Sequence, residues 1–349
     1  MALNMYAGAK ARAEIQEQGL SPHRISMMVG ASGGPKWLML CRLDQYLSEH
    51  FLSQAEQPIH LIGSSIGSWR MACYAQPDPA AAFRKFESLY TNQRYQELTP
   101  QAITDYIDEV LDALFCDEID QAIVDNPKRI LHVVAARNRR LFNSAHPLVQ
   151  GISIALAATL NLLTKQAVPQ LYPRVVVSQA GVVAPYAGAK QTVALTVANL
   201  KQALVASGAI PLVLAPSAIE GAKDRLHWDG GIVDYHFSGP FHVEDGLVFY
   251  PHFFPKVVPG WFDKALPWRK PKPKDFDNVV MLTPSSEFIA SLPMGKIPDR
   301  TDFEKLSDVE REQYWQTVLT RTQELIDDFA SNMAKDLGRS WVQPIDALF

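Results

Sequence analysis

The chain has 349 residues, of which 47% are hydrophobic, so it can bury a large core and is not a disordered protein. Its net charge of −4 argues against a nucleic-acid-binding protein that depends on bulk positive charge. The three cysteines lack CxxC spacing, and charges interrupt the N-terminal stretch where a signal peptide needs apolar residues. We therefore expect a cytoplasmic protein with reduced thiols.

Apolar, β-branched runs alternate with helical patterns along the chain. The predicted strands are 24–29, 59–63, 129–136, 174–179, 192–198, 246–250 and 278–283. The predicted helices are 37–50, 99–114, 148–165, 197–206 and a long last helix from Ser307, capped by Glu310, to about Gly338. Most strands lack alternation of polar and apolar residues, as expected for strands covered on both faces. The pattern predicts an α/β fold, a three-layer α/β/α sandwich with a mainly parallel central sheet.

The organisation of the chain predicts one domain over residues 1–349, because no linker divides the strands into two sets.

The most apolar run, 148–163, is interrupted by four polar residues and is too short for a membrane span. We predict a buried helix there.

The sequence GASGGPKW, residues 30–37, forms a glycine-rich turn between a predicted strand and a predicted helix. Such a turn presents backbone N–H groups to an anion. A nucleotide-binding P-loop is disfavoured, because Pro35 replaces a glycine N–H and Trp37 replaces the Mg²⁺-binding hydroxyl. The transient oxyanion of a reaction remains as the other anion that this loop could hold.

The second motif is GSSIG, residues 63–67, which matches G-x-S-x-G where a strand ends and a helix begins. This context is typical of a nucleophile elbow, in which Ser65 occupies a sharp turn and Gly63 and Gly67 let neighbouring backbone pass. A glycine- and serine-rich turn without chemistry is the alternative.

The third motif is the sequence WDGG, in which Asp229 is followed by Gly230 and Gly231. Asp229 is a candidate base for the serine, which needs one to become nucleophilic. Asp-Gly is also a common turn pair, so the motif alone leaves a structural role open.

Taken together and in this order, the three motifs resemble those of the patatin-like acyl hydrolases, a family of serine lipases and phospholipases. The segment ASGAIPLVLAPSAIEG, residues 206–221, is similar to the family segment that leads to the aspartate. The resemblance covers a motif-bearing core of about 24–235, and leaves 240–349 as a C-terminal extension with an aromatic and basic loop and a long helix.

The resemblance implies a Ser65–Asp229 catalytic dyad that cleaves lipid carboxylic esters through an acyl-enzyme, without a cofactor or a metal ion. It implies an oxyanion hole formed by the backbone of Gly33 and Gly34, with Gly30 setting the turn. The supporting motif residues are Gly63, Gly67, Gly230, Gly231 and Lys36. The loop departs from the family pattern at Ala31, Ser32 and Trp37. Phospholipids, lysophospholipids and acylglycerols are the expected substrates.

Two alternatives stay open. An α/β-hydrolase-type esterase would keep Ser65 and Asp229 and add His236, His242 or His252 as the base of a triad. A catalytically idle, lipid-binding relative would follow if the altered loop cannot hold an oxyanion.

Residues 251–276 combine aromatic rings with lysines and arginines among prolines. Trp261, Phe262 and Trp268 with these cations suit a membrane interface, so we expect peripheral membrane contact there. The alternative is a surface loop whose rings pack on the domain. No nucleic-acid partner is expected.

Overall fold

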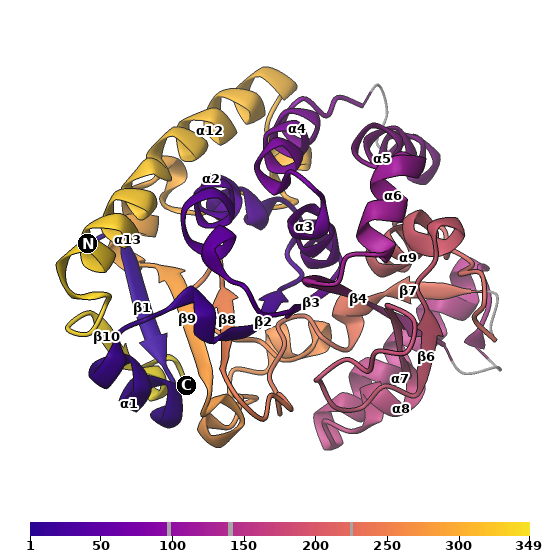
Figure 1. Ribbon diagram of the computed structural model, residues 1–349. Coiled ribbons are helices and arrows are strands. Elements are labelled where there is room, and N and C mark those ends of the chain that lie inside the picture. Colours follow the sequence, from indigo (N-terminus) through magenta and orange to yellow (C-terminus); the bar gives the residue numbers. More distant parts are fainter. Residues whose placement is uncertain (96–98, 139–141, 224–225) are drawn as a thin grey trace.

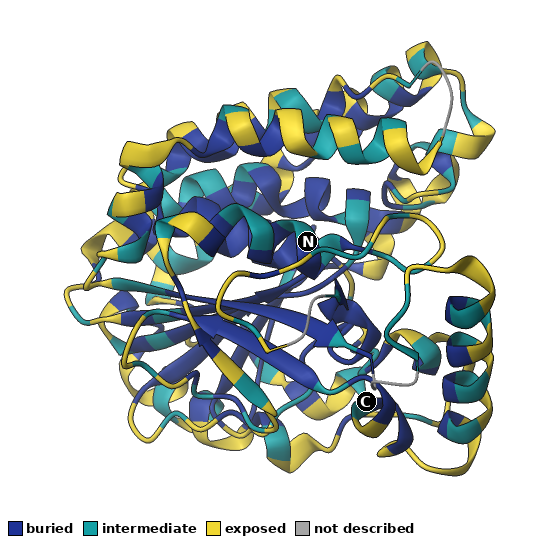
Figure 2. Ribbon diagram, turned by 90° about the vertical axis from the view of Figure 1, so that its right-hand side faces the viewer, coloured by how far each residue is buried: buried dark blue, intermediate teal, exposed yellow. Residues whose placement is uncertain are grey.

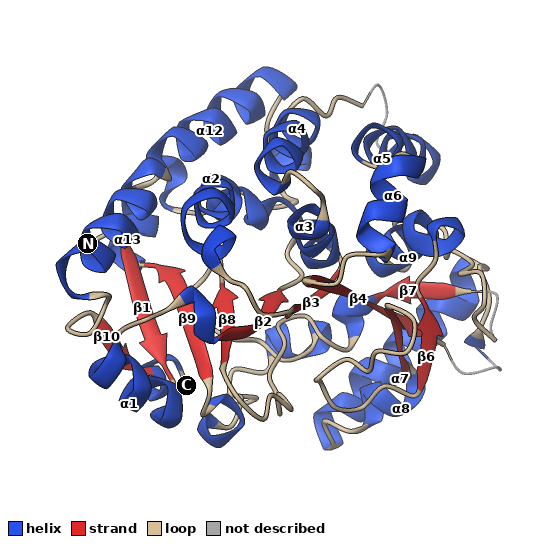
Figure 3. Cartoon of the chain, in the orientation of Figure 1, coloured by secondary structure: helices blue, strands red, loops and turns tan. Residues whose placement is uncertain are grey.

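The structure is a computed structural model that describes residues 1–95, 99–138, 142–223 and 226–349. Within these residues, ten strands form one sheet in the order β10-β1-β9-β8-β2-β3-β4-β5-β6, with β7 paired to β4 (Figure 3). The strands are β1 Leu3–Ala7, β2 Ile25–Gly30, β3 Ile59–Ser64, β4 Arg129–Arg137, β5 Arg174–Ser178, β6 Gln191–Ala194, β7 His227–Asp229, β8 Leu247–Pro251, β9 Val279–Pro284 and β10 Val342–Pro344.

The helices lie on both faces of this sheet (Figure 1). They are α1 Ala9–Gln18, α2 Leu38–Tyr46, α3 Ile66–Ala75, α4 Pro79–Thr91, α5 Pro100–Leu114, α6 Asp117–Val124, α7 Pro147–Leu163, α8 Ala167–Leu171, α9 Val197–Gly208, α10 Ser286–Ser291, α11 Asp302–Lys305, α12 Asp308–Arg321 and α13 Gln323–Asp336. In Figure 1, α2, α3 and α4 lie above the sheet, and α1, α7 and α8 lie below it.

The centre of the sheet is parallel. Neighbouring strands from β9 through β8, β2 and β3 to β4 all run in the same direction. Antiparallel pairing occurs where β1 joins β9 and where β5 and β7 join β4. The central strands are buried between the helical layers (Figure 2), as their continuous apolar sequences require. The predicted three-layer α/β/α sandwich is therefore confirmed.

Each predicted strand corresponds to a strand of the structure, but β6 is shorter than the predicted range 192–198. It ends at Ala194 because Thr196 caps α9 in a capping box with Asn199. Strands β1, β7 and β10 were not predicted. The C-terminal part of the chain supplies β8, β9 and β10 to the same sheet as the motif-bearing strands. The assignment of one domain to the whole chain stays a prediction.

The long last helix is two helices, so the prediction of one continuous helix was wrong. The Ser307 cap is confirmed, because Ser307 and Glu310 exchange both bonds of a capping box. The helix is interrupted at Thr322. The buried hydroxyl of Thr322 donates to the carbonyl of Leu319 at 2.7 Å and so competes with the backbone hydrogen bonds of the helix. The second helix ends at Asp336, and Leu337 after it is left-handed with φ 56°, before Gly338.

Helix α7 is not the buried helix that its apolar sequence predicted. Its buried residues are Gln150, Ser153, Ala157 and Asn161, whereas four leucine and isoleucine side chains are exposed. The polar side chains are turned inward because they find hydrogen-bonding partners there. In the part of the chain that the structure describes, no helix is long and apolar enough to cross a membrane.

Candidate active site

Ser65 lies in a strained turn between the end of β3 and the start of α3. Its φ of 54° and ψ of −133° are rarely adopted by a residue with a side chain. The turn is held from outside, because the backbone N–H of Ser65 donates to Ser207 Oγ at 2.8 Å. The Ser207 hydroxyl in turn donates to the carbonyl of Val134 at 2.6 Å. This geometry is that of a nucleophile elbow.

Close backbone packing explains the glycines that flank Ser65. A Cβ on Gly67 would lie 2.0 Å from the carbonyl oxygen of Gly30, and a Cβ on Gly63 would lie 2.4 Å from that of Gly67. The N-terminus of α3 therefore rests directly on the ends of β2 and β3. Gly30 takes part in this packing and is not among the described residues that line the cavity at Ser65.

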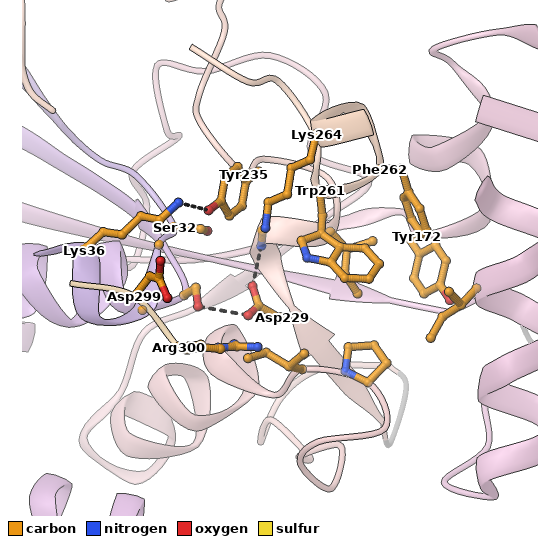
Figure 4. Close-up of a pocket in the computed structure, with 18 of the residues that line it drawn as sticks. Ser32, Lys36, Tyr172, Asp229, Tyr235, Trp261, Phe262, Lys264, Asp299 and Arg300 are labelled. Atoms are coloured by element: carbon orange, nitrogen blue, oxygen red, sulfur yellow. Dashed lines mark hydrogen bonds between the residues drawn. The ribbon is translucent and has the colours of Figure 1, made fainter. Parts of the chain in front are cut away.

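Ser65 and Asp229 meet although 164 residues separate them in sequence. The Ser65 hydroxyl donates to Asp229 Oδ2 at 2.9 Å, and the N–H of Gly231 donates to Asp229 Oδ1 at 2.6 Å (Figure 4). Strand β7 brings Asp229 here by pairing antiparallel with β4, opposite Ala135. Burial raises the pKa of Asp229, and the Gly231 N–H opposes this rise. The carboxylate is therefore a better proton acceptor than an exposed aspartate.

The glycine loop lies beside this pair, because the parallel strands β2 and β3 end at the same edge of the sheet. Gly33 and Gly34 line a cavity of about 230 Å³ together with Ser65 and Asp229. Ser32, which interrupts the glycines in the sequence, holds the loop in place. Its N–H donates to the carbonyl of Tyr235 at 2.9 Å, and its hydroxyl lies 2.7 Å from Ser64 Oγ.

Lys36 and Trp37 point in different directions. Trp37, which departs from the family pattern, is fully buried and stacks on Phe86 with ring centroids 4.2 Å apart. It therefore belongs to the core beneath α4. Lys36 lines the cavity, and its ammonium donates to the hydroxyl of Tyr235 at 3.3 Å. Burial lowers the pKa of Lys36.

Two further cations, Lys264 and Arg300, line the same cavity (Figure 4). Lys264 belongs to segment 251–276, for which we expected membrane contact, and Arg300 was not singled out in the sequence. The Lys264 ammonium lies 3.8 Å from the centre of the Tyr235 ring. Burial, with the positive charges of Lys36 and Arg300, lowers the pKa of Lys264 to about 8. No motif marks these residues, because Lys264 and Arg300 belong to loops that only the fold brings to the cavity.

A second cavity, of about 340 Å³, meets the first at Ser65, Gly34 and Arg300. Aromatic and aliphatic side chains line most of it, including Trp69, Tyr106, Ile107, Val110 and Phe303. Ser65 therefore stands between a cavity lined by three cations and two aspartates and a largely apolar cavity that Arg300 also borders.

The three histidines that a triad would need are placed elsewhere. His236 Nδ1 accepts the N–H of Val258 at 2.9 Å, and His252 Nδ1 lies 2.5 Å from the carbonyl of Phe254. Both are buried, and burial lowers both pKa values, that of His252 to about 3. His242 is exposed. In the described residues, none of the three lines the cavity of Ser65 and Asp229, so this geometry favours a dyad.

A buried ion pair that the sequence did not reveal supports the aspartate loop. Arg174 Nη2 lies 2.7 Å from Asp234 Oδ1, five residues after Asp229. The carbonyl of Asp234 accepts the Ser64 hydroxyl at 2.5 Å, next to the nucleophile elbow. The sequence DGGIVD contained this second carboxylate, but its partner on β5 is visible only in the fold.

Among residues 1–95, 99–138, 142–223 and 226–349, no group of three or more His, Cys, Asp or Glu side chains could hold a metal ion.

Among curated proteins, none matches the chain. The family model for patatin-like phospholipases matches residues 46–236, which contain Ser65 and Asp229 but not the glycine loop. This match covers more than half of the 349 residues, and the chain therefore belongs to the patatin-like phospholipase family.

Proposed function

We propose that the protein is a serine acyl hydrolase that cleaves lipid carboxylic esters with a Ser65–Asp229 dyad. Membership of the family supports lipid acyl hydrolase activity in general. The observation that carries the proposal is the 2.9 Å hydrogen bond from the Ser65 hydroxyl to Asp229, made at a strained nucleophile elbow.

In the proposed reaction, Asp229 accepts the Ser65 proton as Ser65 Oγ attacks the ester carbonyl. The N–H groups of Gly33 and Gly34, aided by the N-terminus of α3, stabilise the oxyanion that forms. The proton passes to the leaving alcohol, and an acyl-enzyme remains. Water, deprotonated by Asp229, then attacks the acyl-enzyme, and the acid leaves as Ser65 regains its proton.

The two cavities suggest how a lipid ester would lie. The apolar cavity of about 340 Å³ suits the acyl chain, since its aromatic and aliphatic lining excludes water. The other cavity would then receive the alcohol part of the substrate. Lys36, Lys264 and Arg300 outnumber the two aspartates of the lining, Asp229 and Asp299. This excess of positive charge favours an alcohol that carries negative charge, which supports phospholipids and lysophospholipids over neutral acylglycerols.

We also propose peripheral membrane contact through residues 251–276 of a cytoplasmic enzyme. Trp268 and Trp261 are 67% and 40% exposed, and the lysines nearby suit anionic lipid. Phe262, like Leu156 and Leu160 of α7, packs against a buried apolar cluster, so the ring contact with lipid falls mainly to the two tryptophans.

Labelling with a fluorescent fluorophosphonate tests the dyad. We expect the wild type to be labelled, Ser65→Ala to lose labelling and Asp229→Asn to be labelled at least 100-fold more slowly. The variant that replaces His236, His242 and His252 with Ala should keep labelling if it folds. Ser53→Ala, at an exposed serine, is the matched control.

Loss of labelling in the folded histidine variant would replace the dyad by a triad. Failure of the folded wild type to be labelled or to hydrolyse short-chain nitrophenyl esters would favour the idle, lipid-binding relative.

A further inference from the structure

Helix α7 has its polar and apolar faces reversed relative to an ordinary surface helix. At 3.6 residues per turn, its exposed apolar residues fall within an arc of about 100°. These residues are Leu148, Ile152, Leu162 and Leu163, which are 72%, 61%, 58% and 80% exposed. Gln150, Ser153 and Asn161 lie on the opposite side and are buried.

Hydrogen bonds fix the rotation of α7. Gln150 Oε1 accepts the N–H of Leu212 at 2.8 Å, and Ser153 Oγ lies 2.8 Å from the hydroxyl of Tyr172. Asn161 Nδ2 donates to Asp263 Oδ1 at 2.8 Å. Turning the helix to bury its leucines would break these bonds, so the apolar face stays directed outward.

The outward face belongs to the same part of the molecule as the cavity at Ser65. Ile154 of α7 lines this cavity, and so does Phe262, which Figure 4 shows among the lining residues. Arg269 Nη2 donates to the carbonyl of Asn161 at 2.6 Å, which ties the aromatic and basic segment to the C-terminal end of α7. A surface that covered the outward face would therefore be separated from this cavity by about the width of one helix.

The charges around this end of α7 are positive although the whole chain carries −4. Exposed lysines at positions 165, 270, 272 and 274 line a cavity of about 440 Å³ that Asn161 also borders. The acidic residues of segment 251–276 are Asp263, which is buried, and Asp275, so its lysines and arginines are in excess. An apolar stripe beside exposed lysines is complementary to a bilayer with anionic lipids.

We propose that α7 lies in the plane of an anionic lipid bilayer, with its exposed apolar stripe among the acyl chains and the lysines at the headgroups. A helix of 17 residues with a polar inner face lies on a membrane and does not cross it. This docking goes beyond the proposed function because binding needs no chemistry. Only its role in delivering substrate to Ser65 rests on that function.

Vesicle co-sedimentation tests the docking surface. The protein carries Ser65→Ala so that the lipid stays intact, and the vesicles are phosphatidylcholine with or without 30% phosphatidylserine. We expect Ile152→Gln/Leu163→Gln to bind the anionic vesicles at least tenfold more weakly, and salt to weaken the binding of the parent protein. The matched control is Val309→Gln, at a valine of α12 that is 57% exposed, and it should bind as the parent does.

Equal binding by the double variant and the parent would overturn the proposal. So would a dimer, measured by light scattering, that the double variant dissociates, because a second copy would then cover the face. Thermal unfolding of both variants should match that of the parent, since the replaced side chains are exposed.

The soluble-ester assay separates this inference from the proposed function. With Ser65 intact, the double variant should hydrolyse a short-chain nitrophenyl ester at the parent rate and vesicle lipid more slowly. Expected vesicle binding without any ester hydrolysis would refute the hydrolase and support the docking surface. Ester hydrolysis without vesicle binding would refute the docking surface alone.

Discussion

Helix α3, which begins directly after Ser65, and helix α7, whose Ile154 lines the cavity at Ser65, both have apolar sequences, yet they are packed in opposite ways. All residues of α3 are buried, including Arg70, whose guanidinium pairs with Asp44 at 2.8 and 2.9 Å. In α7 the buried side chains are mainly polar, and four leucine and isoleucine side chains are exposed. Helix α3 is held from every side and fixes one reactive atom, whereas α7 keeps a face without a partner in the described chain.

Paired glycines give the sharpest test of this contrast. Gly67→Ala in α3 should reduce the fluorophosphonate labelling rate by about 10³-fold or more, because its Cβ would lie 2.0 Å from the carbonyl of Gly30 and displace the elbow. Gly151→Ala in α7 meets nothing within 4 Å and should keep the rate while raising stability by up to about 1 kcal/mol. Labelling kinetics and thermal melts measure both, and similar effects at the two positions would remove the contrast.

The buried ion pair between Arg70 of α3 and Asp44 should contribute more to stability than an exposed ion pair does. Asp44→Asn leaves Arg70 buried without its counter-charge and should lower the free energy of unfolding by about 3–5 kcal/mol. The exposed pair of Asp112 with Lys201 is the matched control, and Asp112→Asn should change it by less than about 1 kcal/mol. Urea unfolding measures both. Comparable values would mean that burial does not govern the Arg70 pair.

Within α7, the inward polar face should matter more than the outward apolar face. Asn161→Leu removes the bond to Asp263 and should lower the free energy of unfolding by about 1–3 kcal/mol. Leu163→Gln should stay within about 0.5 kcal/mol, because the side chain is 80% exposed. The opposite ranking in urea unfolding would show that the outward face is covered in solution.

The smallest effect concerns the pH dependence of hydrolysis. Asp229 accepts a proton only as a carboxylate, so the rate should fall as pH drops through its raised pKa. The positive charge of Lys264 lowers that pKa. Lys264→Met should therefore shift the acid limb to higher pH. Lys270→Met, at an exposed lysine, should leave the profile in place, and an unshifted limb in Lys264→Met would exclude this coupling.

Much of the fold was predictable because buried parallel strands have continuous apolar sequences. The strands β2, β3 and β4 and the turn that holds Ser65 follow from such runs and their glycines. The short strands β1 and β10 were not predicted, since brief runs near an edge carry little pattern. The break at Thr322 depends on one hydroxyl that bonds a backbone carbonyl.

The candidate site was predictable only where a motif marks it. Ser65 and Asp229 stand in motifs, but Lys264 and Arg300 reach the cavity from loops with no local signal. The orientation of α7 could not be predicted from the sequence either, because the average apolarity of a helix does not indicate which of its faces forms hydrogen bonds with the rest of the protein. Ser153 and Asn161 face inward because they form hydrogen bonds there with Tyr172 and Asp263.

The position of the chain ends has a practical consequence for surface-binding experiments. Strand β10 pairs with β1 so that both ends lie on one side of the molecule, and α7 lies on the other (Figure 1). A biotin or fluorophore attached after Phe349 would therefore tether the protein to a sensor chip with α7 facing the solution. Vesicles passed over such a chip would meet the lipid-facing helix first, and the tether would not compete with them.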